Sequence, residues 1–146
     1  MEPADMLHRL KALVRLDIDA FQGYDRAIRE VDHPEVRERL WAYRGDHLRH
    51  VFDLSAVLRE HGEEPPSAEE VTGVQTLGFV GLLGGIGPVG ALEAMRTNET
   101  LVMTYYEEAR SRDFPPAVKA ILERNFRDEA RHLSYVAEVL RTRPWE

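Results

Sequence analysis

Cysteine is absent from the 146 residues of the chain. This absence excludes disulfide bonds, thiolate metal ligands and cysteine nucleophiles, so any metal ion must be bound by oxygen and nitrogen atoms. Basic residues are also in the minority, because 19 Lys and Arg stand against 26 Asp and Glu, a formal net charge of −7. The basic residues are scattered, which leaves no phosphate-binding surface and argues against nucleic acid as a partner.

Proline and glycine are few but stand where helices begin and end, with 8 prolines and 10 glycines in the chain. They divide the chain into four long charged segments, and no alternating apolar pattern predicts a strand. We expect long helices over residues 4–31, 34–61, from 88 onward, and 116–141. The fold class is therefore all-α: a single domain over residues 1–146, built as an antiparallel four-helix bundle with a long connection between the second and third helices.

Apolar residues recur at steps of three and four in each long segment, which is the spacing of a bundle seam. Every seam is interrupted by polar residues close to the middle of its helix. These interruptions are Asp17, His47, His50, Glu99, Glu129 and His132. Side-by-side packing would bring all six groups to one height, so the sequence predicts a polar layer inside the bundle.

The two halves of the chain repeat each other. A shift of 82 positions, the separation of Asp17 and Glu99, also places His50 on His132. Such a repeat predicts two similar hairpins related by an approximate two-fold axis. Groups near that axis would meet at a shared centre.

Ionised carboxylates in an apolar seam cost several kcal/mol unless something compensates their charge. A divalent cation suits mixed oxygen and nitrogen ligands. The spacings H-x-x-H in the second helix and E-x-x-H in the fourth each place two side chains on one helix face, and Asp17 and Glu99 add single carboxylates. A metal-free polar network, in which the same residues fix the register of the helices, is the alternative.

The order of these groups resembles that of ferritin-like, rubrerythrin-type bundles with a carboxylate-bridged di-iron centre. The local patterns D-x-x-A-x-x-x-Y at residues 17–24 and E-x-x-V-x-x-x-Y at residues 99–106 belong to this resemblance, which extends over nearly the whole chain. More closely, DAFQGY at 19–24 and DHPEVRERL at 32–40 resemble a small bacterial ferritin-like family of unassigned function. The resemblance implies iron in the bundle centre and oxidase-type or peroxidase-type chemistry. One or two iron ions are the expected cofactor, and zinc or manganese are the alternatives.

Two residues depart from the pattern that the resemblance implies. Asp17 stands where the family has Glu, and is shorter by one methylene. His47 stands where the family has a bridging Glu, so Glu129 remains the obvious bridging residue. The ligand set loses a negative charge and gains nitrogen, so a single ion, or one tight and one weak site, becomes an alternative, and zinc stands beside iron.

Three further polar residues lie on the same seams. Tyr24 and Tyr106 are two turns from Asp17 and Glu99, where each phenol either hydrogen-bonds a ligand carboxylate of the other hairpin or fills the core. Asn125 precedes the E-x-x-H pair by one turn and either supports a ligand or sets the register.

The stretch Val71–Leu92 carries no charge, but seven glycines and Pro88 interrupt it where a membrane-spanning helix needs large apolar residues. A capping box, S-x-x-E at 67–70, predicts a short fifth helix here. Three interpretations are open: a lid over the bundle, a homodimer face, or insertion into a membrane interface. Since residues 1–10 do not resemble a secretory signal, we expect a cytoplasmic protein.

Two functions of different class follow. The first is a metalloprotein with one or two transition-metal ions in the bundle centre and, as an enzyme, di-iron-type oxidoreductase activity. The second is a metal-free bundle that acts as a dimeric structural or interaction module. The intact E-x-x-H pair favours the first, and His47 in place of the bridging Glu favours the second.

Overall fold

The regular structure is helical throughout the ranges that the computed structural model describes, residues 1–68 and 87–146. It consists of four helices: α1 Pro3–Glu30, α2 Pro34–Glu60, α5 Gly87–Arg110 and α6 Pro116–Thr142. The all-α prediction is confirmed, and the helix boundaries lie close to those expected from proline and glycine. The predicted short fifth helix, and with it most of the 71–92 segment, lies outside the described residues.

Local chemistry explains why the helices begin and end where they do. A proline occupies the first turn of α1, α2 and α6, where its missing N–H leaves no hydrogen bond unmade. At the end of α2, Gly62 adopts a positive φ of 73°. The next residue, Glu63, then donates its backbone N–H to the carbonyl of Leu58 at 2.9 Å, which closes the last turn.

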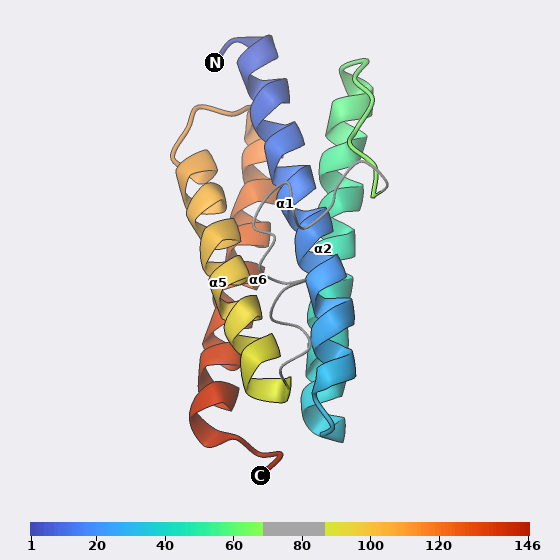
Figure 1. The fold of residues 1–146 in the computed structure, drawn as a ribbon. Helices are drawn as coiled ribbons and strands as arrows, with labels where there is room; N and C mark the ends of the chain where they lie inside the picture. Colours follow the sequence, from blue (N-terminus) through green and yellow to red (C-terminus); the bar gives the residue numbers. More distant parts are fainter. Residues whose placement is uncertain (69–86) are drawn as a thin grey trace.

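The four helices form two antiparallel hairpins, α1–α2 and α5–α6, that pack against each other (Figure 1). Helix α1 contacts α2 and α5, and helix α6 contacts α5 and α2. The end of α2 and the start of α5 lie at opposite ends of the bundle (Figure 1). This arrangement agrees with the two-fold relation between halves that the sequence repeat predicts.

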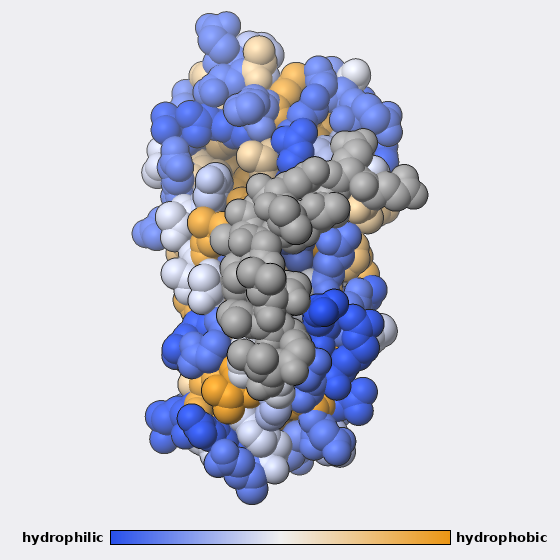
Figure 2. Space-filling view, in the orientation of Figure 1, coloured by the Kyte–Doolittle hydropathy of each residue, from blue (hydrophilic) through white to orange (hydrophobic). Residues whose placement is uncertain are grey.

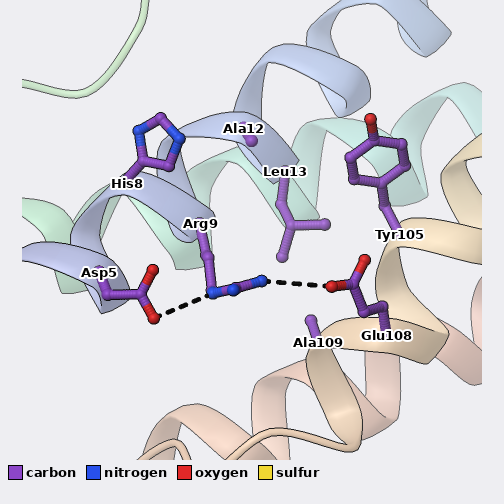
Figure 3. A pocket seen from close by; sticks show the side chains of 8 residues that line it. All are labelled: Asp5, His8, Arg9, Ala12, Leu13, Tyr105, Glu108 and Ala109. Carbon is purple, nitrogen blue, oxygen red and sulfur yellow. Dashed lines mark hydrogen bonds and ion pairs between the residues drawn. The ribbon is translucent and has the colours of Figure 1, made fainter. Parts of the chain in front are cut away.

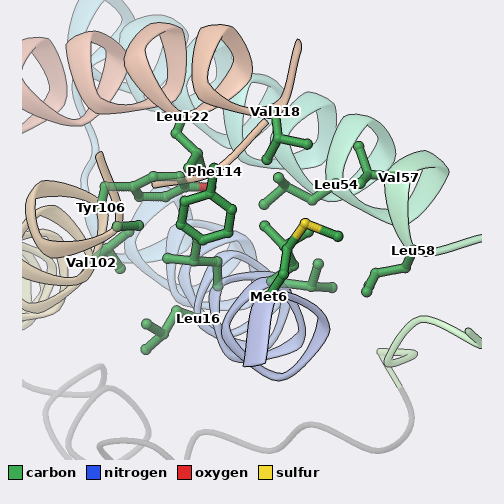
Figure 4. Packing of buried hydrophobic residues seen from close by; sticks show 14 of the residues in the cluster. Met6, Leu16, Leu54, Val57, Leu58, Val102, Tyr106, Phe114, Val118 and Leu122 are labelled. Atoms are coloured by element: carbon green, nitrogen blue, oxygen red, sulfur yellow. The ribbon is translucent and has the colours of Figure 1, made fainter. Parts of the chain in front are cut away.

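The buried apolar residues form two clusters rather than one. The first cluster includes Leu10, Leu54 and Leu122 and is shown in Figure 4. The second includes Leu40 and Leu92. The predicted polar layer lies between the two clusters. Its residues therefore lie in the middle of the bundle, with apolar packing on both sides.

The described surface is largely polar. On the face shown in Figure 2, hydrophilic residues cover most of the coloured surface, and hydrophobic ones appear only in small areas. Among the helices in the described ranges, none has a stretch apolar enough to cross a membrane.

Candidate metal centre

The structure brings all six residues of the predicted polar layer together. Each has 0% exposed surface: Asp17 of α1, His47 and His50 of α2, Glu99 of α5, and Glu129 and His132 of α6. Each of the four helices therefore contributes at least one group. None of the six side chains points into solvent, and all of them lie in one layer.

Ligand-type atoms within this layer form two overlapping groups, and in each group they all lie within 4.8 Å of one another. The first group consists of Asp17, His47, His50 and Glu129. The second group consists of His47, Glu99, Glu129 and His132. Two residues, one imidazole and one carboxylate, thus belong to both groups.

His47 lies between the carboxylates of the two hairpins. Its Nδ1 is 2.7 Å from Asp17 Oδ1, and its Nε2 is 3.0 Å from Glu99 Oε1. Burial disfavours the imidazolium form, but the charges of Glu129 and Glu99 outweigh it and raise the pKa of His47 well above its ordinary value.

The other two imidazoles share one arrangement. Nδ1 of His50 faces the centre, 3.0 Å from Asp17 Oδ1, and its Nε2 is 2.8 Å from Asp128 Oδ2. Nδ1 of His132 is 2.8 Å from Glu99 Oε2, and its Nε2 is 2.8 Å from Asp46 Oδ2. Each ring therefore presents Nδ1 inward and holds Nε2 against a carboxylate of the facing helix.

Sequence reasoning missed the outer carboxylates Asp46 and Asp128 and the two arginines that pair with them. Arg49 contacts Asp128 across the helix interface, and Arg131 Nη2 lies 2.6 Å from Asp46 Oδ2. A signal was present, since the pattern D-x-x-R-H occurs at residues 46–50 and again at 128–132. The 82-residue shift superimposes the two.

The outer carboxylates are held ionised. Burial opposes ionisation of Asp128, but the hydrogen bond and charge of His50, together with Arg49, lower its pKa to about 2. The pKa of Asp46 is also lowered, because His132 and Arg131 outweigh the effect of burial. A carboxylate that accepts Nε2–H fixes the tautomer that leaves the Nδ1 lone pair free.

Both predicted tyrosines contact carboxylates of the opposite hairpin. Tyr24 donates its hydroxyl to Glu99 Oε2 at 3.1 Å, and Tyr106 donates its hydroxyl to Asp17 Oδ2 at 2.5 Å. Asn125 donates from Nδ2 to the Tyr106 hydroxyl at 3.2 Å. These bonds fix the orientation of the two single carboxylates from α1 and α5.

Glu129 differs from every other carboxylate of the layer. Within the described residues, neither of its oxygens accepts a hydrogen bond. Oε1 lies 3.5 Å from Nδ1 of both His47 and His50, and Oε2 lies 3.9 Å from Nδ1 of His132. Burial, followed by the charge of Glu99, raises the pKa of Glu129 well above its ordinary value.

Glu99 and Asp17 show the opposite behaviour. Burial alone would raise the pKa of both carboxyl groups, but His47 and His132 hold the pKa of Glu99 below its ordinary value. His50 and His47 do the same for Asp17. The layer thus contains two carboxylates with imidazole contacts at 2.7–3.0 Å and one, Glu129, whose imidazole contacts are longer, at 3.5–3.9 Å.

A surface cavity of about 230 Å³ between α1 and α5 lies apart from these groups (Figure 3). None of the six buried residues lines it. Its only arginine, Arg9, is already paired with Asp5 and Glu108 at 3.2 and 3.4 Å. We therefore assign the cavity no part in the centre.

The family model described as a domain of unknown function, DUF2383, matches residues 5–112. The chain belongs to the DUF2383 family. This family has a ferritin-like fold, in agreement with the four-helix architecture of the chain. No curated protein matches the sequence significantly. The match covers the ligand-type residues of α1, α2 and α5, whereas the E-x-x-H pair of α6 lies beyond it.

Proposed function

We propose that this DUF2383 chain is a metal-binding protein of the rubrerythrin type that holds one or two transition-metal ions in the bundle centre. Iron is the first choice, with zinc and manganese as alternatives. The ligands are the six buried residues of the layer: Asp17, His47, His50, Glu99, Glu129 and His132.

The oxygens of Glu129 carry this proposal, because neither has a hydrogen-bond partner within the described residues. A carboxylate buried without a hydrogen-bond donor costs several kcal/mol, and such groups are rare in folded proteins. Both oxygens of Glu129 face imidazole Nδ1 atoms, at 3.5 and 3.9 Å. A cation between these atoms would satisfy the carboxylate and the imidazoles together.

The surroundings of the imidazoles support the same conclusion. His50 and His132 each have an outer carboxylate on Nε2, an arrangement typical of metal-binding histidines. Tyr24 and Tyr106 hold Glu99 and Asp17 in place by hydrogen bonds. The layer is thus built as a set of oriented ligands, and all of its members are excluded from water.

A bound redox-active ion such as iron would supply electron transfer to a small oxidant, dioxygen or peroxide, which is the reaction type that the ferritin-like resemblance implies. The residues of this chain would bind and orient the ion and keep bulk water away. Zinc in the same ligands would instead form a structural or hydrolytic site.

Glu129→Gln tests the proposal, because Gln keeps the shape of Glu129 but removes its charge. The protein is purified without affinity metals and incubated with iron(II) or zinc, and its metal content is determined by elemental analysis. We expect metal in the parent protein and less in the variant, whose affinity should fall by at least about tenfold, the lower end of the effect of altering even the groups that support metal ligands.

The matched control is Glu123→Gln, on the same helix, where the side chain pairs with Arg110 at 2.9 Å. It should leave the metal content unchanged. A parent protein that binds neither ion would favour the metal-free bundle, the alternative function of an interaction module.

A further inference from the structure

The two halves of the centre are related by the sequence repeat but differ at one pair of positions. The 82-residue shift pairs Asp17 with Glu99, Asp46 with Asp128, and Arg49 with Arg131. Each of these pairs keeps the same charge. The pair His47 and Glu129 does not, because an imidazole stands opposite a carboxylate. Any inequality between the halves therefore starts from these two residues.

Glu129 can serve both halves at the same time. Its Oε1 faces His47 and His50, and its Oε2 faces His132. A carboxylate has lone pairs on both oxygens, so one side chain can bind two ions.

His47 cannot do the same while its ring is neutral. A neutral imidazole has one nitrogen with a free lone pair and one N–H. Nδ1 of His47 faces Asp17, at 2.7 Å, and Nε2 faces Glu99, at 3.0 Å. If one nitrogen binds an ion, the other donates its hydrogen to the carboxylate of the other half. His47 thus adds a ligand to one half only.

The distances show which half receives it. Nδ1 of His47 and Nδ1 of His50 approach the same oxygen, Asp17 Oδ1, at 2.7 and 3.0 Å. Both also lie 3.5 Å from Glu129 Oε1. Four atoms, two nitrogens and two oxygens, therefore converge. A tetrahedral ion with ligands at 2.0–2.1 Å separates its ligand atoms by roughly 3.3 Å, close to these values.

The ligand-type atoms of the other half also lie within 4.8 Å of one another, but its two imidazoles do not approach the same oxygen. His47 Nε2 approaches Glu99 Oε1, whereas His132 Nδ1 approaches the second oxygen, Oε2, at 2.8 Å. Glu129 Oε2 lies farther from His132 Nδ1, at 3.9 Å. With the hydrogen of His47 Nε2 directed at Glu99, this half offers three ligands.

We propose that the centre has two unequal metal sites: a tight tetrahedral one formed by Asp17, His47, His50 and Glu129, and a weaker one formed by Glu99, Glu129 and His132. This proposal rests on the proposed function and adds the order in which ions bind. The weaker site, with fewer protein ligands, is the one that keeps positions open for a small oxidant.

Cobalt(II) provides the test, because its visible absorption is intense in tetrahedral sites and faint in octahedral ones. The full-length chain, treated with a chelator and dialysed, is titrated with cobalt(II) by calorimetry and absorption spectroscopy. We expect two binding events, the first at one ion per chain, at least tenfold tighter, and accompanied by the tetrahedral absorption.

Two variants related by the repeat form the matched pair. His50→Ala should remove the tight event and its absorption, whereas His132→Ala should remove the weak event and leave the first unchanged. His47→Glu should bring the two affinities together, because the shared residue then has two oxygens. Circular dichroism and thermal unfolding of each variant establish that it is folded.

The outcomes separate this inference from the proposed function. Two equal events in the parent protein, or identical effects of His50→Ala and His132→Ala, would overturn the unequal sites but leave the metal centre standing. If neither cobalt(II) nor zinc binds to the parent protein, the metal centre itself is wrong. A variant that fails to fold is replaced by His50→Gln or His132→Gln, which keep more of the side-chain volume.

Discussion

At the scale of single residues, the buried layer shows how similar side chains acquire different roles from their neighbours. Glu99 receives hydrogen bonds from Tyr24 and faces His47 and His132. Glu129, equally buried, receives no hydrogen bond within the described residues. Without a cation, Glu99 is a stabilising hydrogen-bond acceptor and Glu129 is an unsatisfied polar group. Substitutions at the two positions should therefore change the free energy of unfolding in opposite directions.

Glu129→Met should stabilise the metal-free protein. Met fills a similar volume without an unsatisfied polar group, so we expect the free energy of unfolding to rise by about 1–3 kcal/mol. Glu99→Met should lower it by about 3–5 kcal/mol, because the partners of Glu99 lose their acceptor. Denaturant unfolding in the presence of a chelator measures both. Equal effects of the two substitutions would contradict the assigned roles.

The same residues show what the sequence could and could not predict. The six ligand-type residues were found because each interrupts an apolar seam, and helical spacing converts such an interruption into a buried position. Asp46 and Asp128 were missed because they flank the seam. Their contact with His132 and His50 depends on how closely α2 and α6 approach, which periodicity within one helix does not report.

At the scale of helices, the boundaries could be predicted because proline and glycine act locally. Pro34 and Pro116 begin α2 and α6, and Gly62 follows the end of α2. The unequal surroundings of Glu129 could not be predicted in this way. They depend on the distances between side chains of different helices. The spacing of residues within one helix does not report those distances.

Two glycines associated with α2 give a matched prediction. Gly62→Ala should lower the free energy of unfolding by about 1 kcal/mol or more, because Ala is strained at a φ of 73°. Gly45→Ala should raise it by about 0.4–1 kcal/mol, because Gly45 is inside the helix and an added Cβ meets no atom within 4 Å. Chemical denaturation of both variants measures the difference. Opposite signs are expected, and a loss of stability in both would show that Gly45 has a structural role.

At the scale of the whole molecule, the centre joins all four helices, so a bound ion stabilises the folded chain as a unit. An ion at a hundred times its dissociation constant adds about 2.7 kcal/mol to the free energy of unfolding. For a domain of this size, this corresponds to a rise in Tm of roughly 5–11 °C. Calorimetry with zinc, compared with a chelator, should show the rise.

Glu129→Gln is the control for this measurement, because it retains the fold without the shared ligand. Its Tm should rise by at most about half as much at the same zinc concentration, because a site weaker by tenfold adds only about 1.4 kcal/mol. A parent protein with the same Tm in zinc and in chelator would count against a metal that spans the four helices.

The two hairpins are parts of one chain, and this has a consequence for how the centre could evolve. If two identical hairpins came together as separate molecules, every substitution would appear twice, on both sides of the axis. Fusion removes that restriction, since position 47 can change to His while position 129 remains Glu. A single chain with two repeated hairpins can therefore have two unequal sites. A symmetric assembly of two identical half-length chains cannot.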